Sequence, residues 1–540
     1  MLHYWPRVSM ALTIRDIDPL KYVEETHGAG VPPLVHDNEI EVDFEVVQAL
    51  LGQAEQNCTG IDYLLYDLVQ RHSNILAVLR QPLDPVVSSP ASVVSRQFSC
   101  EQLLTINLAA RQARNLLEGE SKAVAQKIQD WSFQCANAKI TELLFKSDDE
   151  SVPFLLLSAY ILMSDVYPIG ALKLIQAAGD RLGRCSRRPI NDEIWKERLY
   201  CCLRLHHIIE SEILLTMDGL PSESVSAALN QISYIKTLKE VETGYVNLSV
   251  AEIAKLKLSE HISETTFAIC GIQNKVLTQV YSIEQAYSRP SMLAHAISDL
   301  KTQLCAWFDA LPLEWHFPRD LSSVMSMPSP ATSFLRPLRI KYYLVEFLMC
   351  RPVLYYIAHE SFENSADHPI DPSPGESTTS QENHPFWVYD ACYRCLQCAA
   401  LLIVDEKPMV SENLGRFQRD WFEVHMFVQP PRTHDKQKLT PHRIWGAALT
   451  LVVAVGTPSL AKFLPKHGNT TDSMSLLNLA EEILQAASQQ SGVIARCTAY
   501  LRNVKENMIN NNNENNNHLM HEAVLDDAYH DTGEVDETVL

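Results

Sequence analysis

The segment from Trp195 to Asp218 carries apolar side chains at a repeat that only an α-helix can gather on one face. At intervals of four and three residues, the apolar stripe consists of Trp195, Leu199, Cys202, His206, Ile209 and Ile213. A second set, which recurs every seven residues, consists of Glu197, Arg204, Ser211 and Asp218. The pattern predicts a half-buried helix. Gly219 suits a left-handed cap and Pro221 cannot continue a helix, so we expect it to end there.

The same helical periodicity continues along most of the chain. Turn signals interrupt it at residues 147–151, 187–191, 219–224 and 328–330. No segment sustains the alternation of apolar and polar residues that a half-buried strand requires. With 46% hydrophobic and 21% charged residues, the composition is that of a folded chain. The sequence therefore predicts an all-α, multi-helical domain.

Changes in composition divide the chain of 540 residues into six parts. We expect a loosely ordered segment (1–40), a helical segment with a proline-rich linker (41–99), the first part of a helical domain (100–360), a disordered insertion (361–385), the second part of that domain (386–508), and an Asn-rich hinge with an acidic tail (509–540). Residues 518–540 contain seven acidic residues and neither Lys nor Arg. Such a tail is either an activation segment or a solvated acidic tail.

The charge balance makes direct DNA binding by this chain doubtful. Lys and Arg number 45 and Asp and Glu 66, a formal charge of −21 that repels a phosphate backbone. The densest basic cluster consists of Arg181, Arg184, Arg187 and Arg188. No aromatic residues are interleaved with it, so we expect a solvated turn between helices.

Cysteine usage and hydropathy favour a reducing compartment without a membrane. The 13 cysteines are scattered, which predicts free thiols rather than a disulfide framework. The N-terminal residues lack the pattern of a signal peptide. The longest apolar run, from Ile444 to Val455, falls short of the roughly 20 residues that a membrane helix needs. We expect it to be a buried core helix.

Two clusters have residue types that can bind metals. In the first, Cys392, Cys395 and Cys398 lack a second ligand pair of zinc spacing, so we expect buried or half-buried helix cysteines. The second consists of His206, His207 and Glu210, where no third and fourth ligand can be identified. His206 lies on the apolar stripe, which favours a hydrogen-bonded core histidine. We therefore predict no metal site.

Motifs of the common catalytic classes are missing from the sequence. It contains no Gly-x-Ser-x-Gly elbow, no Gly-x4-Gly-Lys loop, no His-Glu-x2-His and no Gly-x-Gly-x2-Gly after a strand. We therefore expect no enzymatic activity, no catalytic residue and no cofactor, and cofactor-binding residues cannot be named.

Four stretches, in this order, resemble the regulatory middle region of fungal-specific transcription factors. The Trp195 helix with its Glu-Ser-Glu and Gly-Leu-Pro is similar to one helix of that region. Residues 152–183 resemble its helical hairpin, with Pro168 at the turn. Residues 334–360 resemble the long helix with an Arg-Pro step, here Arg351-Pro352, where proline should kink or interrupt the helix. Residues 387–403 resemble the next core helix. The resemblance covers roughly residues 100 to 505.

The resemblance implies a nuclear transcription regulator, of the kind that governs secondary-metabolite or nutrient-utilisation genes. The family usually reads DNA through a zinc cluster of six cysteines, but the only cysteine before Cys100 is Cys58. We expect that cluster to be absent from this sequence, either lost or encoded upstream. The chain would then act through the transcription machinery or a DNA-binding regulator, as a homo- or heterodimer. The alternative is a helical scaffold or small-molecule-binding protein outside transcription.

Overall fold

A computed structural model describes residues 44–57, 98–114, 117, 119–145, 149–164, 168–187, 193–216, 221–232, 250–281, 289–326, 335–366, 384–412, 441–465, 473–488, 495 and 498–506. Within these ranges every regular element is helical and there is no strand, which confirms the all-α prediction. The predicted N-terminal segment (1–40), the proline-rich linker, most of the predicted insertion and the Asn-rich hinge and tail lie outside the described residues.

The helices are bounded as follows. They are α3 (Phe44–Asn57), α7 (Cys100–Arg114), α8 (Gly119–Ala138), α9 (Ile140–Phe145), α10 (Val152–Ser164), α11 (Pro168–Cys185), α12 (Glu193–Thr216), α13 (Glu223–Ile232), α14 (Val250–Val280), α15 (Pro290–Asp309), α16 (Leu321–Ser326), α17 (Leu335–Ala366), α18 (Phe386–Glu412), α20 (Pro441–Val455), α21 (Pro458–Ala461) and α22 (Ser473–Ser488). Two 3-10 turns, η2 (Asp149–Ser151) and η4 (Leu313–Trp315), lie between them. Residues 498–506 are also helical.

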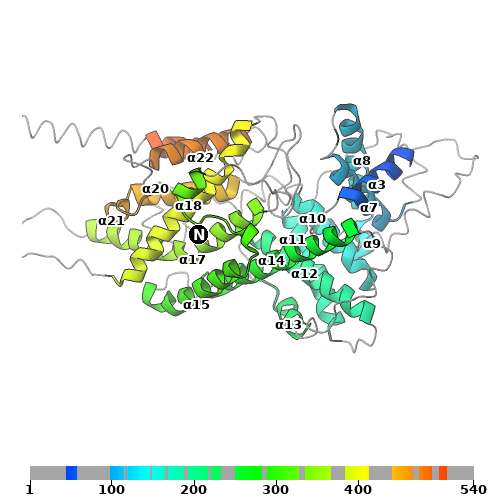
Figure 1. Cartoon of the computed structure of the whole chain (residues 1–540), viewed down its shortest axis with the longest axis horizontal. Helices are drawn as coiled ribbons and strands as arrows, with labels where there is room; N and C mark the ends of the chain where they lie inside the picture. The colour runs from blue at the N-terminus through cyan, green and yellow to red at the C-terminus, as the bar shows by residue number, and fades with distance from the viewer. Residues whose placement is uncertain are drawn as a thin grey trace, which may run out of the picture.

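Helices that are close in sequence pack together along the molecule (Figure 1). At one end α3, α7 and α8 form a group, followed by α10, α11, α12 and α13. The long helix α14 contacts α12 and also reaches α15 and α17. At the other end α17, α18, α20 and α22 pack on one another. The domain is thus a continuous series of helix pairs.

The predicted hairpin of residues 152–183 forms as a pair of packed helices, α10 and α11. Pro168 is the first residue of α11, where its missing N–H leaves no helical bond unmade. All residues of α10 from Val152 to Met163 are buried, so this helix lies inside the core.

The prediction of a half-buried helix is wrong for the second half of α12. Every residue from Cys202 to Leu214 is buried, including the predicted polar positions Arg204 and Ser211. The reason is that α12 packs against α10 and α11 and also against α13 and α14. Arg204 lies 3.7 Å from the carboxylate of Glu264 on α14, so its charge is paired rather than solvated.

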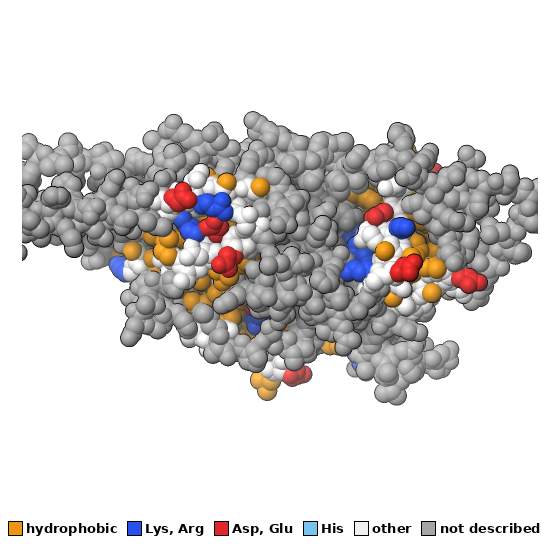
Figure 2. Space-filling view, turned by 90° about the horizontal axis from the view of Figure 1, so that it is seen from above, with side chains coloured by type: hydrophobic (Ala, Val, Ile, Leu, Met, Phe, Trp, Pro, Cys, Tyr) orange, Lys and Arg blue, Asp and Glu red, His pale blue; other side chains and the backbone are white. Residues whose placement is uncertain are grey.

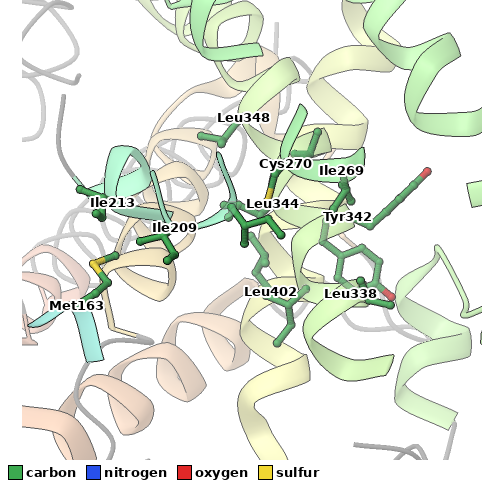
Figure 3. Close-up of a cluster of buried hydrophobic side chains, with 14 of the residues drawn as sticks. Met163, Ile209, Ile213, Ile269, Cys270, Leu338, Tyr342, Leu344, Leu348 and Leu402 are labelled. Carbon is green, nitrogen blue, oxygen red and sulfur yellow. The ribbon is translucent and has the colours of Figure 1, made fainter. Parts of the chain in front are cut away.

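Side chains of α12, α14, α17 and α18 belong to one cluster of buried hydrophobic residues (Figure 3). Ile209 of α12, Ile269 of α14, Leu344 of α17 and Leu402 of α18 are all buried in this cluster. Burying large aliphatic side chains stabilises the fold by roughly 1.5–3 kcal/mol each. These four helices therefore hold the two ends of the domain together.

Helix α17 runs through Pro352 without interruption. It also continues to Ala366, six residues into the segment for which the composition predicted an insertion. Residues 361–366 contain neither Gly nor Pro, and the next proline is Pro369, so nothing in the local sequence stops the helix earlier.

Among the described residues one segment, Phe386–Asp405 of α18, is long and apolar enough to cross a membrane. It is 72% buried within the protein, and α18 packs between α17, α20 and α22. That burial is typical of the core helix of a folded domain. The predicted core helix at Ile444–Val455 is likewise found inside α20, and most of its residues are buried.

Candidate functional site

Ionisable side chains lie inside the core, mainly between α12, α17 and α18. The buried set includes Arg204, His206, His207, Glu210, Glu212, Arg339, Lys341, Glu346 and Asp405. Transferring a charge out of water is strongly unfavourable unless it is paired and hydrogen-bonded. The partners of each group therefore determine its protonation state and its chemical reactivity.

Two of the pairs connect α17 to its neighbours. Lys341 of α17 forms an ion pair with Glu212 of α12, and both side chains are almost fully buried. Arg339 forms an ion pair with Asp405 of α18. Arg336 donates a hydrogen bond of 2.7 Å to the backbone carbonyl of the same aspartate. These contacts fix the rotation of α17 about its own axis.

Glu346 of α17 accepts two hydrogen bonds from the Arg394 guanidinium of α18, at 2.8 and 2.6 Å. Such a forked arrangement is strong and geometrically specific. Burial works against the charge of Arg394, yet its hydrogen bonds with Glu346 raise its pKa above the ordinary value. The Cys398 thiol also donates to this carboxylate, at 3.4 Å. The pairing order, Arg339 with Asp405 and Glu346 with Arg394, shows that the two helices are antiparallel.

The three cysteines of α18 are fully buried, in agreement with the prediction for Cys392, Cys395 and Cys398. Burial raises the pKa of Cys392 to about 12 and those of Cys395 and Cys398 well above their ordinary values. These thiols therefore stay protonated and unreactive at neutral pH. In the described part of the chain, no three His, Cys, Asp or Glu residues are placed to hold a metal ion.

His206 of α12 is fully buried and bonded to the neighbouring helix α11. Its Nε2 lies 2.9 Å from the carbonyl oxygen of Ile175, so this nitrogen carries the proton and donates. Gly179 makes the approach possible, because a Cβ at that position would lie 2.7 Å from the same nitrogen. The predicted core histidine is confirmed.

Glu210 lies one turn further along α12 and faces α13. Both of its carboxylate oxygens are 3.2 Å from the backbone nitrogen of Ser222, the residue before α13. Oε2 is also 4.0 Å from Nδ1 of His206. Burial lowers the pKa of His206 to about 4. Burial also raises the pKa of Glu210 to about 7, although the Ser222 N–H opposes this. A proton therefore resides on the carboxyl group before it resides on the imidazole.

His207 belongs to a different environment from His206. Its ring packs on Phe267 of α14, with centroids 5.0 Å apart. Neither ring nitrogen has a hydrogen-bond partner within the described residues. Burial lowers its pKa to about 3, and His206 and Lys341 add to the effect. Of the cluster formed by His206, His207 and Glu210 in the sequence, His206 and Glu210 lie near each other, whereas His207 faces α14.

The prediction of a solvated basic cluster is wrong for Arg181. This side chain is buried in α11, where it donates to the Ser151 hydroxyl and, at 2.9 Å each, to the carbonyls of Leu143 and Leu144. The carbonyls at the end of α9 lack helical partners, and a cation satisfies them well. Arg184 and Arg187 are exposed as predicted, and Arg188 lies outside the described residues.

The visible face in Figure 2 has acidic, basic and apolar side chains interspersed over its described part. The basic residues there do not gather into a stripe of the kind that follows a phosphate backbone.

The sequence interpretation missed the buried ion pairs of α17. A signal was present, because Arg339, Lys341 and Glu346 interrupt a strongly apolar helix on several of its sides. Charges placed all round such a helix must face other helices and find partners there. The identity of those partners depends on helix packing, which periodicity alone does not give.

Comparisons with protein-family models, with curated proteins and with solved structures found no match.

Proposed function

We propose that this chain is the helical regulatory domain of a transcription regulator of the fungal-specific class, acting in the nucleus through a protein partner. The supporting observation is that the four resembling stretches meet in one core. They fall in α10 with α11, in α12, in α17 and in α18, which pack in that order with α14 between α12 and α17. The four stretches that carry the family resemblance thus also form the central framework of the fold.

The Arg-Pro step of the resemblance has a defined structural role, which further supports the proposal. Arg351 packs over the rings of Tyr281 and Phe347, at 5.5 and 5.2 Å from their centroids. Its Nε donates to the Tyr281 hydroxyl at 3.3 Å. The step therefore joins α17 to the end of α14 through packing and a hydrogen bond, which is an architectural role.

A partner-dependent mode of action follows from electrostatics. The formal charge of −21 opposes association with DNA, whose binding requires Lys and Arg to displace counterions. A negatively charged helical domain is better suited to binding a protein than to binding the phosphate backbone. Secondary-metabolite or nutrient-utilisation genes are the proposed targets.

The test of this proposal measures transcription directly. Deleting the gene in its source organism should change transcript levels of a limited gene set, and a fluorescent fusion of the full chain should accumulate in the nucleus. In a gel-shift assay the purified chain alone should give no sequence-specific complex. Unchanged transcripts together with cytoplasmic fluorescence would contradict the proposal, and specific binding by the chain alone would contradict the partner-dependent version.

A helical small-molecule-binding or scaffold protein is the second candidate. The observation that favours it is the buried ring of His207, whose two nitrogens have no partner among the described residues. Buried polar groups are usually satisfied, so such a group is suited to contact a polar ligand. Deletion would then alter metabolite levels without altering transcripts, which distinguishes this candidate from the first.

A further inference from the structure

Helix α13 is short and covers one side of α11 and α12. Its apolar face consists of Val225, Ala228 and Leu229, which are buried against those helices. Ser222 starts the helix, because its carbonyl accepts the N–H of Ser226 at 3.1 Å. The backbone N–H of Ser222 points the other way, to Glu210. Docking of α13 therefore places one helix end on a buried carboxyl group.

His206 completes this arrangement. Its Nε2 is occupied as a donor to Ile175, so in the neutral ring Nδ1 carries a lone pair. That nitrogen is buried without a partner and lies 4.0 Å from the Glu210 carboxyl. When Glu210 is ionised, Nδ1 and the carboxylate oxygen are both hydrogen-bond acceptors, so no hydrogen bond can form between them. Facing a carboxylic acid, Nδ1 can accept the O–H once the two groups close from 4.0 Å to hydrogen-bond distance, while the second oxygen still accepts the Ser222 N–H.

We propose that Glu210 is a proton-dependent latch for α13. In its protonated form it bridges the Ser222 N–H and His206 Nδ1 and holds the helix on α11 and α12. When the proton leaves to solvent, a buried negative charge with a single N–H partner is left behind; the cost of its burial outweighs the stronger bond to Ser222, and α13 loosens so that water can reach the carboxylate. This device is independent of the function proposed above.

Other charges do not account for this behaviour. Besides His206 and His207, the ionisable groups in the described parts of the packed helices include Lys173, Asp180 and Arg181 on α11, Glu223 on α13 and Glu264 on α14. On α12, Arg204 is paired with Glu264 and Glu212 with Lys341 of α17. Lys173, Asp180, Glu223 and Glu264 are exposed, and Arg181 is bonded to carbonyls of α9. Burial raises the Glu210 pKa, the Ser222 N–H lowers it, and no neighbouring charge contributes.

Linkage gives the direction of the effect. The carboxyl holds its proton more tightly when α13 covers it, with a pKa of about 7, than in water, where it is 4.5. Docking is therefore favoured at low pH and weakens as pH rises toward and through 7. For one proton, and for an undocked state in which water reaches the carboxyl freely, the docking equilibrium should fall about tenfold between about pH 6 and pH 8.

Hydrogen–deuterium exchange of the full chain, followed by mass spectrometry of peptides from α13, tests the latch. After correction for intrinsic rates, protection of α13 in the wild type should drop about tenfold between about pH 6 and pH 8, while peptides from α10 change little. Glu210→Gln keeps the shape, a carbonyl acceptor and an N–H donor, so its α13 should stay protected at both pH values. Glu223→Gln, at the exposed first residue of α13, should behave as the wild type.

A wild-type α13 whose protection does not change with pH overturns the proposal without reference to any variant. So does a pH dependence that persists in Glu210→Gln. Far-UV circular dichroism of each variant verifies that the helices are intact, which separates loss of the latch from loss of the fold.

Discussion

The hydroxyl of Tyr281, at the end of α14, donates a hydrogen bond of 2.6 Å to the backbone carbonyl of Leu348 in α17. This is the carbonyl that Pro352 deprives of its helical partner, because proline at the fourth following position has no N–H. A side chain from another helix thus supplies the missing donor. It explains how α17 continues through a proline in its interior.

Replacing Tyr281 by Phe should therefore destabilise the protein. The change removes only the hydroxyl, leaves the Leu348 carbonyl without this donor, and removes the acceptor for Arg351 Nε. An unsatisfied buried acceptor costs about 1–3 kcal/mol. Urea unfolding should show a loss of that size, whereas Tyr393→Phe, at an exposed site of α18, should change stability by less than about 0.5 kcal/mol. Equal stability of the two variants would argue against this role for Tyr281.

The Lys341–Glu212 pair should behave as a buried ion pair. Lys341→Met leaves the carboxylate of Glu212 buried without its partner charge, at a cost of about 3–5 kcal/mol. The double variant with Glu212→Leu should recover much of this loss, because an apolar pair of similar volume suits the core. Thermal or urea unfolding of the single and double variants measures the coupling.

The exposed pair formed by Lys301 and Asp390 serves as the matched control for the Lys341 and Glu212 variants. It has a distance of 2.8 Å but lies at the surface. Lys301→Met should cost no more than about 1 kcal/mol, since water screens such pairs. Additive effects of the Lys341 and Glu212 substitutions would show that the buried pair is not coupled.

The sequence predicted those features of the fold that depend on local pattern. Helical periodicity gave the fold class, and Pro168 gave the start of α11 correctly. The local pattern gave the wrong environment where packing between helices determines it. Arg181, which we expected in solvent, is buried because it bonds to backbone carbonyls at the end of α9. For the candidate site, the i, i+4 spacing of His206 and Glu210 indicated that they share a face. That Ser222 and Ile175 complete the site depends on how α13 and α11 dock, which no local pattern encodes.

Gly179 should be required for the position of His206. In Gly179→Ala the new methyl group would lie 2.7 Å from Nε2 and 3.4 Å from a methyl group of Val225. The imidazole must shift and weaken its bond to Ile175, so we expect a loss of about 1–3 kcal/mol despite the better helix propensity of alanine. At Gly52 in α3 a Cβ meets nothing within 4 Å. Gly52→Ala should therefore stabilise by up to about 1 kcal/mol in the same unfolding assay, and a Gly179→Ala variant as stable as this control would refute the steric argument.

His207 should make the protein sensitive to acid. Its pKa is about 3 in the folded chain against an ordinary value of 6.5, so the unfolded chain takes up a proton first as pH falls. The stabilisation that comes from keeping His207 neutral in the folded chain is thus fully present above pH 6.5. It is lost as pH falls from 6.5 toward 3. Between about pH 6.5 and pH 5 the loss amounts to about 2 kcal/mol. His207→Leu cannot take up this proton, so the decline in unfolding free energy over that range should be smaller by about that amount. His295→Leu, at a site where the imidazole is 90% exposed, should leave the slope unchanged, and a His207→Leu slope equal to that of the wild type would contradict the prediction.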